Sequence, residues 1–295
     1  MTHNGVMSRS FYLDAPSLVY RAFFALPKTL RAPDGRSVNA VRGFMEMVTR
    51  LIVDHRPDEV VAAFDADWRP AFRVEAYAGY KSERPEDPEE LPPQFPILAE
   101  VLDAAGLVRV EAAGLEADDV LATLIARKPK ELFAEIVTGD RDLLVLVRDP
   151  DVRLLYPVRG VSELQEFDEA AVKDKYGIAP QRYSQFAMLR GDPSDGLPGV
   201  AGIGPVRAAK LLDEHGSIES ILEHVGDLPP KQAGAFEDAL AYLEAMKTVV
   251  SLVNDAELES TEGHSPHAGE MERLAREYNL GSSAARLGQA LRGDR

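Results

Sequence analysis

The 295-residue sequence contains no cysteine, so disulfide bonds, thiolate metal sites and cysteine nucleophiles are excluded. It also lacks the run of about 20 apolar residues that a membrane-spanning helix needs. The first residues, Met1 to Arg9, are polar and have no apolar segment of the kind found in a secretory signal. We therefore expect a soluble protein of the reducing cytoplasm, without a membrane partner.

Motifs of several enzyme classes are also missing. No glycine-rich loop ends in Gly-Lys-Ser or Gly-Lys-Thr, which argues against ATP binding, and no Gly-x-Ser-x-Gly motif indicates a serine hydrolase. Gly202-Ile203-Gly204 lacks the third glycine of a dinucleotide-binding fingerprint. The six histidines do not have the spacing of a metal site.

Basic residues are scarce: 33 Lys and Arg stand against 49 Asp and Glu, which gives a net charge of −16. Affinity for nucleic acid usually comes from cations that neutralise phosphates, so the total charge argues against such a partner. However, many of the acids are clustered at the ends of apolar runs, where they could bind metal cations that a phosphate would meet. The charge balance therefore neither supports nor excludes nucleic acid as the partner.

The first half of the chain alternates short apolar runs with segments of helical periodicity. Such alternation predicts an α/β fold with a mostly parallel sheet that is covered by helices on both faces. The predicted strands are Ser10 to Asp14, Glu59 to Asp65, Phe133 to Thr138 and Val152 to Tyr156, and the predicted helices are Val38 to Val53, Pro96 to Ala105 and Leu115 to Ala126.

The second half has a different character. From about Tyr176 the chain is predicted to form short helices separated by glycine and proline, with no strand. Two amphipathic helical pieces, broken at Gly281, lie between Met271 and Leu291. We therefore expect two domains, residues 9–175 and 176–295.

Clusters of acids follow the predicted strands. A single acid in such a place is often only a turn residue or a helix cap. However, parallel strands end at one edge of the sheet, and crowded carboxylates raise one another's pKa unless cations neutralise them. Sites of oxygen ligands suit Mg²⁺ or Mn²⁺, and two such ions about 4 Å apart can hydrolyse a phosphodiester. The candidate ligands are Asp14, Asp65, Glu116, Asp118, Asp119, Asp140, Asp142, Asp192 and Asp195.

These clusters lie within motifs that resemble, in sequence and in order, the 5′ nuclease domain of bacterial DNA polymerase I and its stand-alone relatives, the bacterial flap endonucleases. The resemblance extends from about Ser10 to the C-terminal helices, and it implies a PIN-like nuclease core and a helical domain with a helix–three-turn–helix element. No polymerase domain follows in this sequence, so we expect a self-contained nuclease. The matching motifs are Leu13-Asp14, Tyr20-Arg21-Ala22-Phe23, Phe64-Asp65, Phe72-Arg73, Tyr80-Lys81, Glu116-Ala117-Asp118-Asp119, Thr138-Gly139-Asp140-Arg141-Asp142-Leu143, Arg190 to Val200 and Gly202-Ile203-Gly204.

The resemblance also implies roles for the site residues. Arg21 and Lys81 would stabilise charge on the scissile phosphate. Two divalent ions, Mg²⁺ or Mn²⁺, would be bound, and a monovalent cation is a further candidate at the helix–three-turn–helix element. Asp14, Asp65, Glu116 and Asp118 would hold the first divalent ion, and Asp119, Asp140, Asp142, Asp192 and Asp195 would serve the second directly or through water.

The DNA contacts implied by the resemblance fall into two regions. The proline-rich stretch at about 73–96 would form the family's arch over the active site, although in this chain it is rich in acids. Gly199 to Leu212 would bind duplex DNA, although Pro205-Val206 stands where relatives often have a lysine. The implied contacts are Tyr20, Tyr77 and Tyr80 for unpaired bases and Arg73, Arg84, Gly202, Gly204, Arg207 and Lys210 for the DNA backbone, but the tyrosines could equally be packing residues.

We therefore predict a monomeric 5′-3′ exonuclease and flap endonuclease that acts on flaps, nicks and 5′ ends of DNA. It would work in the nucleoid beside a DNA polymerase and a ligase, and RNA primers paired to DNA are a second candidate substrate. The 5′ polarity comes from the resemblance alone. The alternatives are a junction-binding protein without catalysis, a small ribonuclease of the related acidic-sheet class, and an acidic protein whose metals serve only stability.

Overall fold

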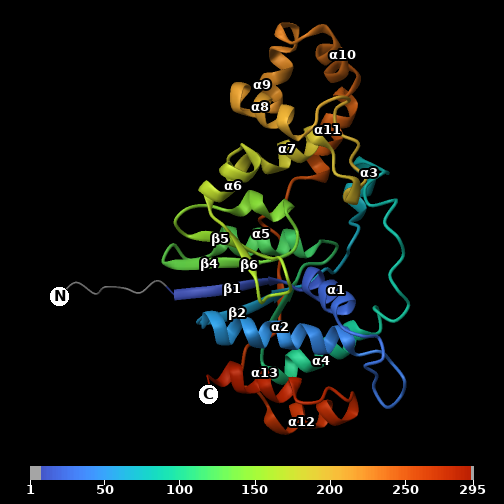
Figure 1. Ribbon diagram of the computed structural model, residues 1–295, viewed down its shortest axis with the longest axis vertical. Coiled ribbons are helices and arrows are strands. Elements are labelled where there is room, and N and C mark those ends of the chain that lie inside the picture. Colours follow the sequence, from blue (N-terminus) through green and yellow to red (C-terminus); the bar gives the residue numbers. More distant parts are fainter. Residues whose placement is uncertain (1–7, 294–295) are drawn as a thin grey trace, which may run out of the picture.

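The computed structural model describes residues 8–293, in which a seven-stranded sheet has helices on both faces and a helical domain at one side (Figure 1). Five neighbouring strands are parallel, in the order β5-β4-β1-β2-β3, and the edge strands β6 and β7 are antiparallel to them. The predicted mostly parallel sheet is confirmed. The strands are β1 (Ser8–Asp14), β2 (Glu59–Ala63), β3 (Val108–Glu111), β4 (Leu132–Val137), β5 (Val152–Pro157), β6 (Leu164–Phe167) and β7 (Glu259–Ser260).

Strands β3, β6 and β7 are additions to the four that the sequence predicts. The expectation of no strand beyond Tyr176 is wrong, because the chain returns to the sheet after the helical domain and pairs Ser260 with Val110 and Glu259 with Glu111. Both residues of β7 are exposed. Backbone pairing therefore places β7 in the sheet, and its side chains carry no apolar pattern that would reveal it.

The two faces of the sheet form separate hydrophobic cores, because consecutive residues of a strand point to opposite faces. Phe11 and Leu13 of β1 belong to the core formed with α1, α2, α4 and the C-terminal helices. Tyr12, between them, belongs to the core formed with α5, and that core continues into the helical domain. The helices of this part are α1 (Ala15–Ala25), α2 (Asn39–His55), α3 (Ala71–Ala76), α4 (Gln94–Ala105) and α5 (Ala117–Arg127).

The helical domain comprises α6 to α11 and lies on the α5 side of the sheet (Figure 1). The last two helices, α12 and α13, leave it and pack against α4 and α2 on the opposite face. Gly281, with φ = 61°, separates these two helices, as the sequence predicts. The helices are α6 (Glu169–Tyr176), α7 (Tyr183–Arg190), α8 (Pro205–His215), α9 (Ile218–Glu223), α10 (Pro230–Asp238), α11 (Leu240–Val249), α12 (Ala268–Glu277) and α13 (Ser283–Arg292).

Between residues 8 and 293, no helix is long and apolar enough to cross a membrane.

A buried ion-pair network around Arg73 connects three parts of the chain. Arg73 lies on α3 and is 2% exposed. Its guanidinium donates to both carboxylate oxygens of Asp119, at 2.7 and 2.8 Å, and to the carboxylate of Glu116 at the start of α5. It also donates to the carbonyl oxygens of Val249 (3.0 Å) and Ser251 (3.2 Å), at the end of α11. The network therefore joins the segment after β2, the helix α5 and the helical domain.

Residues that follow α11 continue this attachment along α5. The main-chain nitrogen of Val253 donates to Asp119 (2.9 Å), and the hydroxyl of Thr123 donates to the carbonyl of Val253 (3.2 Å). The nitrogen of Ala256 donates to the same hydroxyl (3.3 Å). The connection from the helical domain back to the sheet is thus fastened to one face of α5.

We predict that Arg73→Ala lowers the free energy of unfolding by about 3–5 kcal/mol, because Glu116 and Asp119 would remain buried without their cation. Urea denaturation followed by circular dichroism measures this. Arg50→Ala is the control, since it breaks only an exposed pair with Asp54 (3.1 Å) and should cost about 0–1 kcal/mol. Equal losses in the two variants would contradict a structural role for Arg73.

We also predict that Leu287→Ala lowers the free energy of unfolding by about 2–5 kcal/mol, because Leu287 is fully buried in the core that α13 shares with α2. Guanidinium denaturation measures the change. Gln289→Ala, on the exposed side of the same helix, should change stability by less than about 0.5 kcal/mol. If Leu287→Ala were equally harmless, α13 would not be part of the folded core.

Candidate active site

The predicted acids meet at the carboxyl ends of the parallel strands. Asp14 is the last residue of β1, Asp65 follows β2, and Asp140 follows β4. Because β1 lies between β2 and β4, these three acids come to one edge of the sheet. This is the edge at which parallel α/β sheets bind their ligands.

Asp14 is held in place from two sides. One carboxylate oxygen accepts from the nitrogen of Ser17 (3.2 Å) and so caps α1, and the other accepts from the hydroxyl of Thr138 (2.5 Å). The hydroxyl of Ser17 in turn accepts from the nitrogen of Gly139 (2.9 Å). Burial raises the pKa of Asp14 to about 7, and the charge of Asp140 acts in the same direction. Ser17 and Thr138 are not among the predicted site residues, although Thr138 begins one of the matching motifs.

Helix α5 brings a further acid to the same edge. The carboxylate of Asp65 accepts from the nitrogen of Ala117 (2.7 Å) and thereby holds the first turn of α5 beside β2. Asp118, the next residue, has a carboxylate without a hydrogen bond or ion pair to any residue of 8–293. Burial raises the pKa of Asp118 well above its usual value, and the charges of Asp140 and Asp14 raise it further.

Asp142 is in a similar situation on the β4 side. The carboxylate of Asp140 accepts from the nitrogen of Asp142 (2.9 Å), but the Asp142 carboxylate itself has no partner within the described part of the chain. Burial raises the pKa of Asp142, and Asp140, Asp195 and Asp192 add to the effect. The carboxylates of Asp118 and Asp142 thus have free oxygen atoms in a region of excess negative charge.

The helical domain contributes the last two acids through the connection between α7 and α8. Asp192 accepts from the nitrogen of Ser194 (3.0 Å) and from Arg190 (2.9 Å). Asp195 accepts from Arg84 (2.6 Å), and its carbonyl oxygen accepts from the nitrogen of Lys81 (3.0 Å). The base of the predicted arch and the helical domain therefore meet beside the acids.

A cavity of about 30 Å³ lies among these acids, with Glu116, Asp118, Asp142 and Asp195 in its lining. In residues 8–293, no three His, Cys, Asp or Glu side chains already converge on one point where a metal ion could sit. The donors nevertheless fit Mg²⁺ or Mn²⁺, because all of them are carboxylate oxygens and several carboxylates lack a neutralising partner.

Glu116 is the exception, since cations already surround it. Its carboxylate accepts from Arg73, from the hydroxyl of Tyr80 (2.8 Å) and from the ammonium of Lys81. Lys81 has φ = 50°, in the left-handed region that residues other than glycine rarely adopt. The bond from its nitrogen to Asp195 helps to keep it there, and strain of this kind is often found at functional sites.

Three predicted site residues lie within the buried network rather than on a surface that DNA could reach. Arg73, Tyr80 and Asp119 are at most 4% exposed, and the polar atoms of their side chains bond to one another, to Glu116 or to the main chain. These side chains are thus already engaged within the protein, and the predictions that Arg73 and Tyr80 contact DNA and that Asp119 binds a metal stay predictions. A charge buried in this way is already compensated by its partners.

The other predicted aromatic contacts are partly engaged as well. Tyr77 is half-buried and packs edge to face against Tyr242, with 6.2 Å between the ring centroids. The hydroxyl of Tyr20 donates to Asp87, in the proline-rich stretch. That contact, together with the pair between Lys28 and Glu90 (3.2 Å), fastens this stretch to the α1 side of the molecule.

The predicted duplex-binding element, Gly199 to Leu212, covers the turn before α8 and most of that helix. Gly202 has φ = 74°, and there is open space where a side chain at Gly202 or Gly204 would lie. Arg207 donates to the carbonyl of Gly202 (2.9 Å), and Lys210 lies 3.6 Å from Glu214. Val206 is 87% exposed in the first turn of α8. A backbone phosphate could approach the two glycines without steric hindrance.

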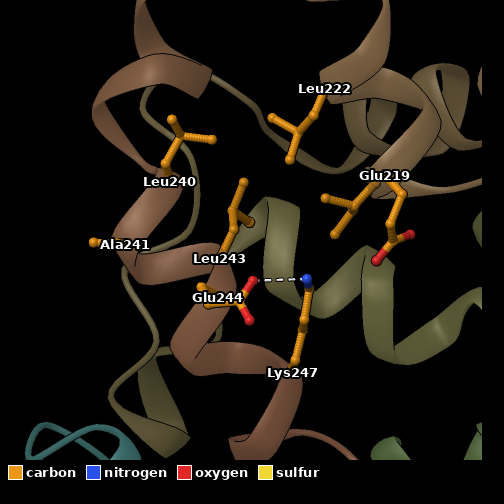
Figure 2. Close-up of a pocket in the computed structure, with 8 residues that line it drawn as sticks. Glu219, Leu222, Leu240, Ala241, Leu243, Glu244 and Lys247 are labelled. Atoms are coloured by element: carbon orange, nitrogen blue, oxygen red, sulfur yellow. Dashed lines mark hydrogen bonds and ion pairs between the residues drawn. The ribbon is translucent and has the colours of Figure 1, made fainter.

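A second hollow, of about 360 Å³, lies between α9 and α11 and contains none of the predicted site residues (Figure 2). Its inner wall is formed by Leu222, Leu240 and Leu243, and Lys247 at its edge pairs with Glu244 (2.7 Å). It is an apolar groove of the helical domain, separate from the acidic cluster.

Comparison with known proteins agrees with this geometry. Residues 9–177 match the family model of the 5′-3′ exonuclease N-terminal resolvase-like domain, and residues 178–270 match that of the 5′-3′ exonuclease C-terminal SAM fold. A 5′-3′ exonuclease of Streptomyces coelicolor is 47% identical over 93% of this chain and 97% of its own length. DNA polymerase I of Mycobacterium bovis is 43% identical over 84% of this chain, which corresponds to 28% of the polymerase.

The fold is also found in a solved structure. The flap endonuclease of bacteriophage T5, in a complex with DNA and metal ions, has a TM-score of 0.65 at 17% identity, and the match covers 96% of this chain and 99% of that one. The two family models together extend through the sheet, the acidic cluster and the helical domain. The chain therefore belongs to the 5′-3′ exonuclease family.

Proposed function

We propose that this 5′-3′ exonuclease is a structure-specific nuclease that cuts DNA at 5′ flaps, nicks and 5′ ends with the help of two divalent metal ions. The proposal is carried by one observation: Asp118 and Asp142 have free carboxylates on a cavity where the sheet edge meets the α7–α8 connection. A site at this junction can act on a strand whose duplex part is bound by the helical domain. The T5 enzyme of the same fold, which was crystallised with DNA and metal ions, supports this interpretation.

Four acids are the proposed core of the metal site, because desolvation raises the pKa of each and the charge of Asp140 raises the pKa of the other three: Asp14, Asp118, Asp140 and Asp142. Asp65, Asp192 and Asp195 would act around them, directly or through water, and Glu116 would join once Lys81 leaves it. When bound, two Mg²⁺ or Mn²⁺ ions supply an activated water and stabilise the leaving oxygen. The protein residues fix where the ions, and hence the attacked phosphate, are placed.

Lys81 and Arg84 are proposed to orient the scissile phosphate, since both lie at the base of the arch against the acids. Arg21 is proposed to orient the same phosphate from the other side of the acidic cluster. Arg73 and Asp119 would instead stabilise the fold, as would Tyr80. The assignment of each cation follows from its partners: Arg73 bonds to two carboxylates and to the main chain of the helical domain, whereas Lys81 and Arg84 each form an ion pair with a single acid of the cluster.

The duplex part of the substrate is proposed to bind at Gly202 and Gly204, whose main chain is open to a phosphate. A monovalent cation at this turn would have to compete with Arg207 for the carbonyl of Gly202. Contacts of this kind do not read base sequence, so the preference would be for DNA shape. A monomer is sufficient for this mode of binding, and RNA paired to DNA would be a second substrate. The expected setting is the nucleoid, with a DNA polymerase and a ligase as functional partners.

We predict that Asp118→Asn lowers the rate of cleavage by about 100-fold or more, because it removes a metal-binding charge without changing the size of the side chain. The assay uses a 5′-flap DNA labelled at its 3′ end, incubated with Mg²⁺, Mn²⁺ or EDTA. Asp174→Asn, an exposed residue of α6, is the control and should retain full activity. Cuts should cluster at the flap junction.

Intact DNA with wild-type protein under every metal, while the flap is still bound tightly, would contradict the nuclease and favour a junction-binding protein. Cleavage that survives in Asp118→Asn would instead contradict the proposed metal site. Metal that raises the melting temperature without any cleavage or DNA binding would indicate a purely structural role for the acids.

We further predict that Val206→Lys increases affinity for duplex DNA by roughly 2- to 5-fold at moderate salt, because it adds a cation at an exposed position beside the two glycines. Fluorescence anisotropy with a labelled duplex at several NaCl concentrations measures this. Val53→Lys, on an exposed face of α2, is the matched control and should add little. An equal gain in both variants would mean that only net charge matters and that the duplex does not bind at α8.

A further inference from the structure

Two arginines beside the acidic cluster share one aromatic ring. The guanidinium carbon of Arg21 lies 5.3 Å from the ring centroid of Tyr156, and that of Arg141 lies 5.7 Å from the same centroid. Tyr156 is on β5, Arg21 is on α1, and Arg141 directly follows Asp140 after β4. Because β5, β4 and β1 are adjacent, the pair lies at the sheet edge that carries the acids.

Neither guanidinium forms an ion pair with a carboxylate within residues 8–293. Arg141 stands between Asp140 and Asp142 in the sequence and forms an ion pair with neither of them. Most of the cations that surround the site are already paired, as Lys81 is with Glu116 and Arg84 is with Asp195. Two unpaired arginines on one ring are therefore available for an anion from outside the protein.

The guanidinium of Arg21 lies against the main chain at Gly139. A Cβ at Gly139 would lie 2.8 Å from Cζ of that arginine, so a side chain there would displace the guanidinium. The φ angle at Gly139 is not in the left-handed region, so the contact with Arg21 is the steric consequence of a substitution here.

The platform below the two arginines is rigid. Tyr156 stacks edge to face with Phe167, and Phe167 contacts Tyr176, with 6.5 and 6.4 Å between the respective centroids. Tyr176 packs against Tyr183 and Phe186 of α7. A rigid aromatic support limits the side-chain entropy that each arginine would lose on binding an anion.

We propose that Arg21 and Arg141, supported by Tyr156, form a binding site for one phosphate of the substrate strand on the β4–β5 side of the metal site. Lys81 and Arg84, which follow β2 in the chain, pair with Glu116 and Asp195 of the same cluster. The strand would then meet cations from two different parts of the fold, with Arg141 as a phosphate-binding residue. Arg141 lies in the matching motif Thr138 to Leu143, but the resemblance assigns it no role. This inference rests on the proposed function, since it assumes that the acids act on a DNA strand.

The test compares Arg141→Gln with Arg56→Gln, which removes the same charge from an exposed arginine at the opposite edge of the sheet, just before β2. The binding of a 5′-flap DNA is measured by fluorescence anisotropy in EDTA at a series of NaCl concentrations. We expect Arg141→Gln to weaken binding by about fivefold and to lower the slope of log K against log [NaCl] by about one. Arg56→Gln should keep the wild-type slope, and Arg141→Lys should restore most of it.

Gly139→Ala provides a second, independent variant, because it leaves both arginines in the chain and only displaces Arg21. We expect a loss of affinity similar to that of Arg21→Gln, with a melting temperature within about 2 °C of wild type. Arg141→Gln should likewise keep its melting temperature. A fall in melting temperature without a change in the salt slope would overturn the proposal and assign the arginines to packing.

Two substrates identify which phosphate is bound. One is a recessed end with either a 5′-phosphate or a 5′-hydroxyl, and the other is a flap in which single phosphates are replaced by neutral methylphosphonates. If modifying one phosphate makes wild type and Arg141→Gln bind the DNA with equal affinity, that phosphate is the one that Arg141 contacts. If no substitution does so, the proposal is wrong. A wild type that neither binds nor cuts any of these DNAs would refute the nuclease function itself, whereas normal cutting with Arg141→Gln indistinguishable from Arg56→Gln would refute only the phosphate site.

Discussion

The position of the active-site residues depends on the buried charge of Arg73. Glu116 and Asp119 are both buried at the start of α5, and two buried carboxylates without a cation would strongly destabilise the fold. Arg73 supplies it in a forked geometry that only arginine offers. Once Arg73 is fixed, α3 is fixed as well, and the chain leads from α3 to Tyr80 and Lys81, which bond to the same Glu116. One ionic contact therefore determines where the arch begins.

The same guanidinium also sets the position of the helical domain, because it bonds to the carbonyl groups at the end of α11. Through this attachment, the α7–α8 connection is held where Asp192 and Asp195 complete the acidic cluster. The proposed duplex site at Gly202 and the proposed metal site at Asp118 are thus held in one arrangement. The fold sets the distance between these two proposed sites, which would let the enzyme cut at a defined distance from the duplex without contacts to the bases.

A net charge of −16 need not prevent the binding of DNA, because association depends on the local field. In the proposed function, the acids are neutralised by the metals that they bind. Many of the surface cations are paired with acids and would contribute little to DNA affinity. The guanidinium groups of Arg21 and Arg141, which have no ion pair within residues 8–293, would then contribute more to the affinity for DNA than their number suggests. An acidic surface around a few free cations would weaken non-specific binding along duplex DNA and favour the structures that place a phosphate at those cations.

The strand ends and their acids could be predicted from the sequence, because an apolar run that ends in aspartate defines both the strand and the sheet edge. Which of these acids are free and which are already paired within the protein could not be predicted from the sequence. Asp118 and Asp119 are neighbours with identical chemistry, and both resemble metal ligands in the motif. A helix turns by about 100° per residue, so one side chain faces the cavity while the other faces Arg73. Which of them is available for a metal is decided by a cation on α3 and by a main-chain nitrogen at Val253, and contacts at such sequence separations leave no local pattern. The adjacent acids differ only in what the rest of the fold brings to them.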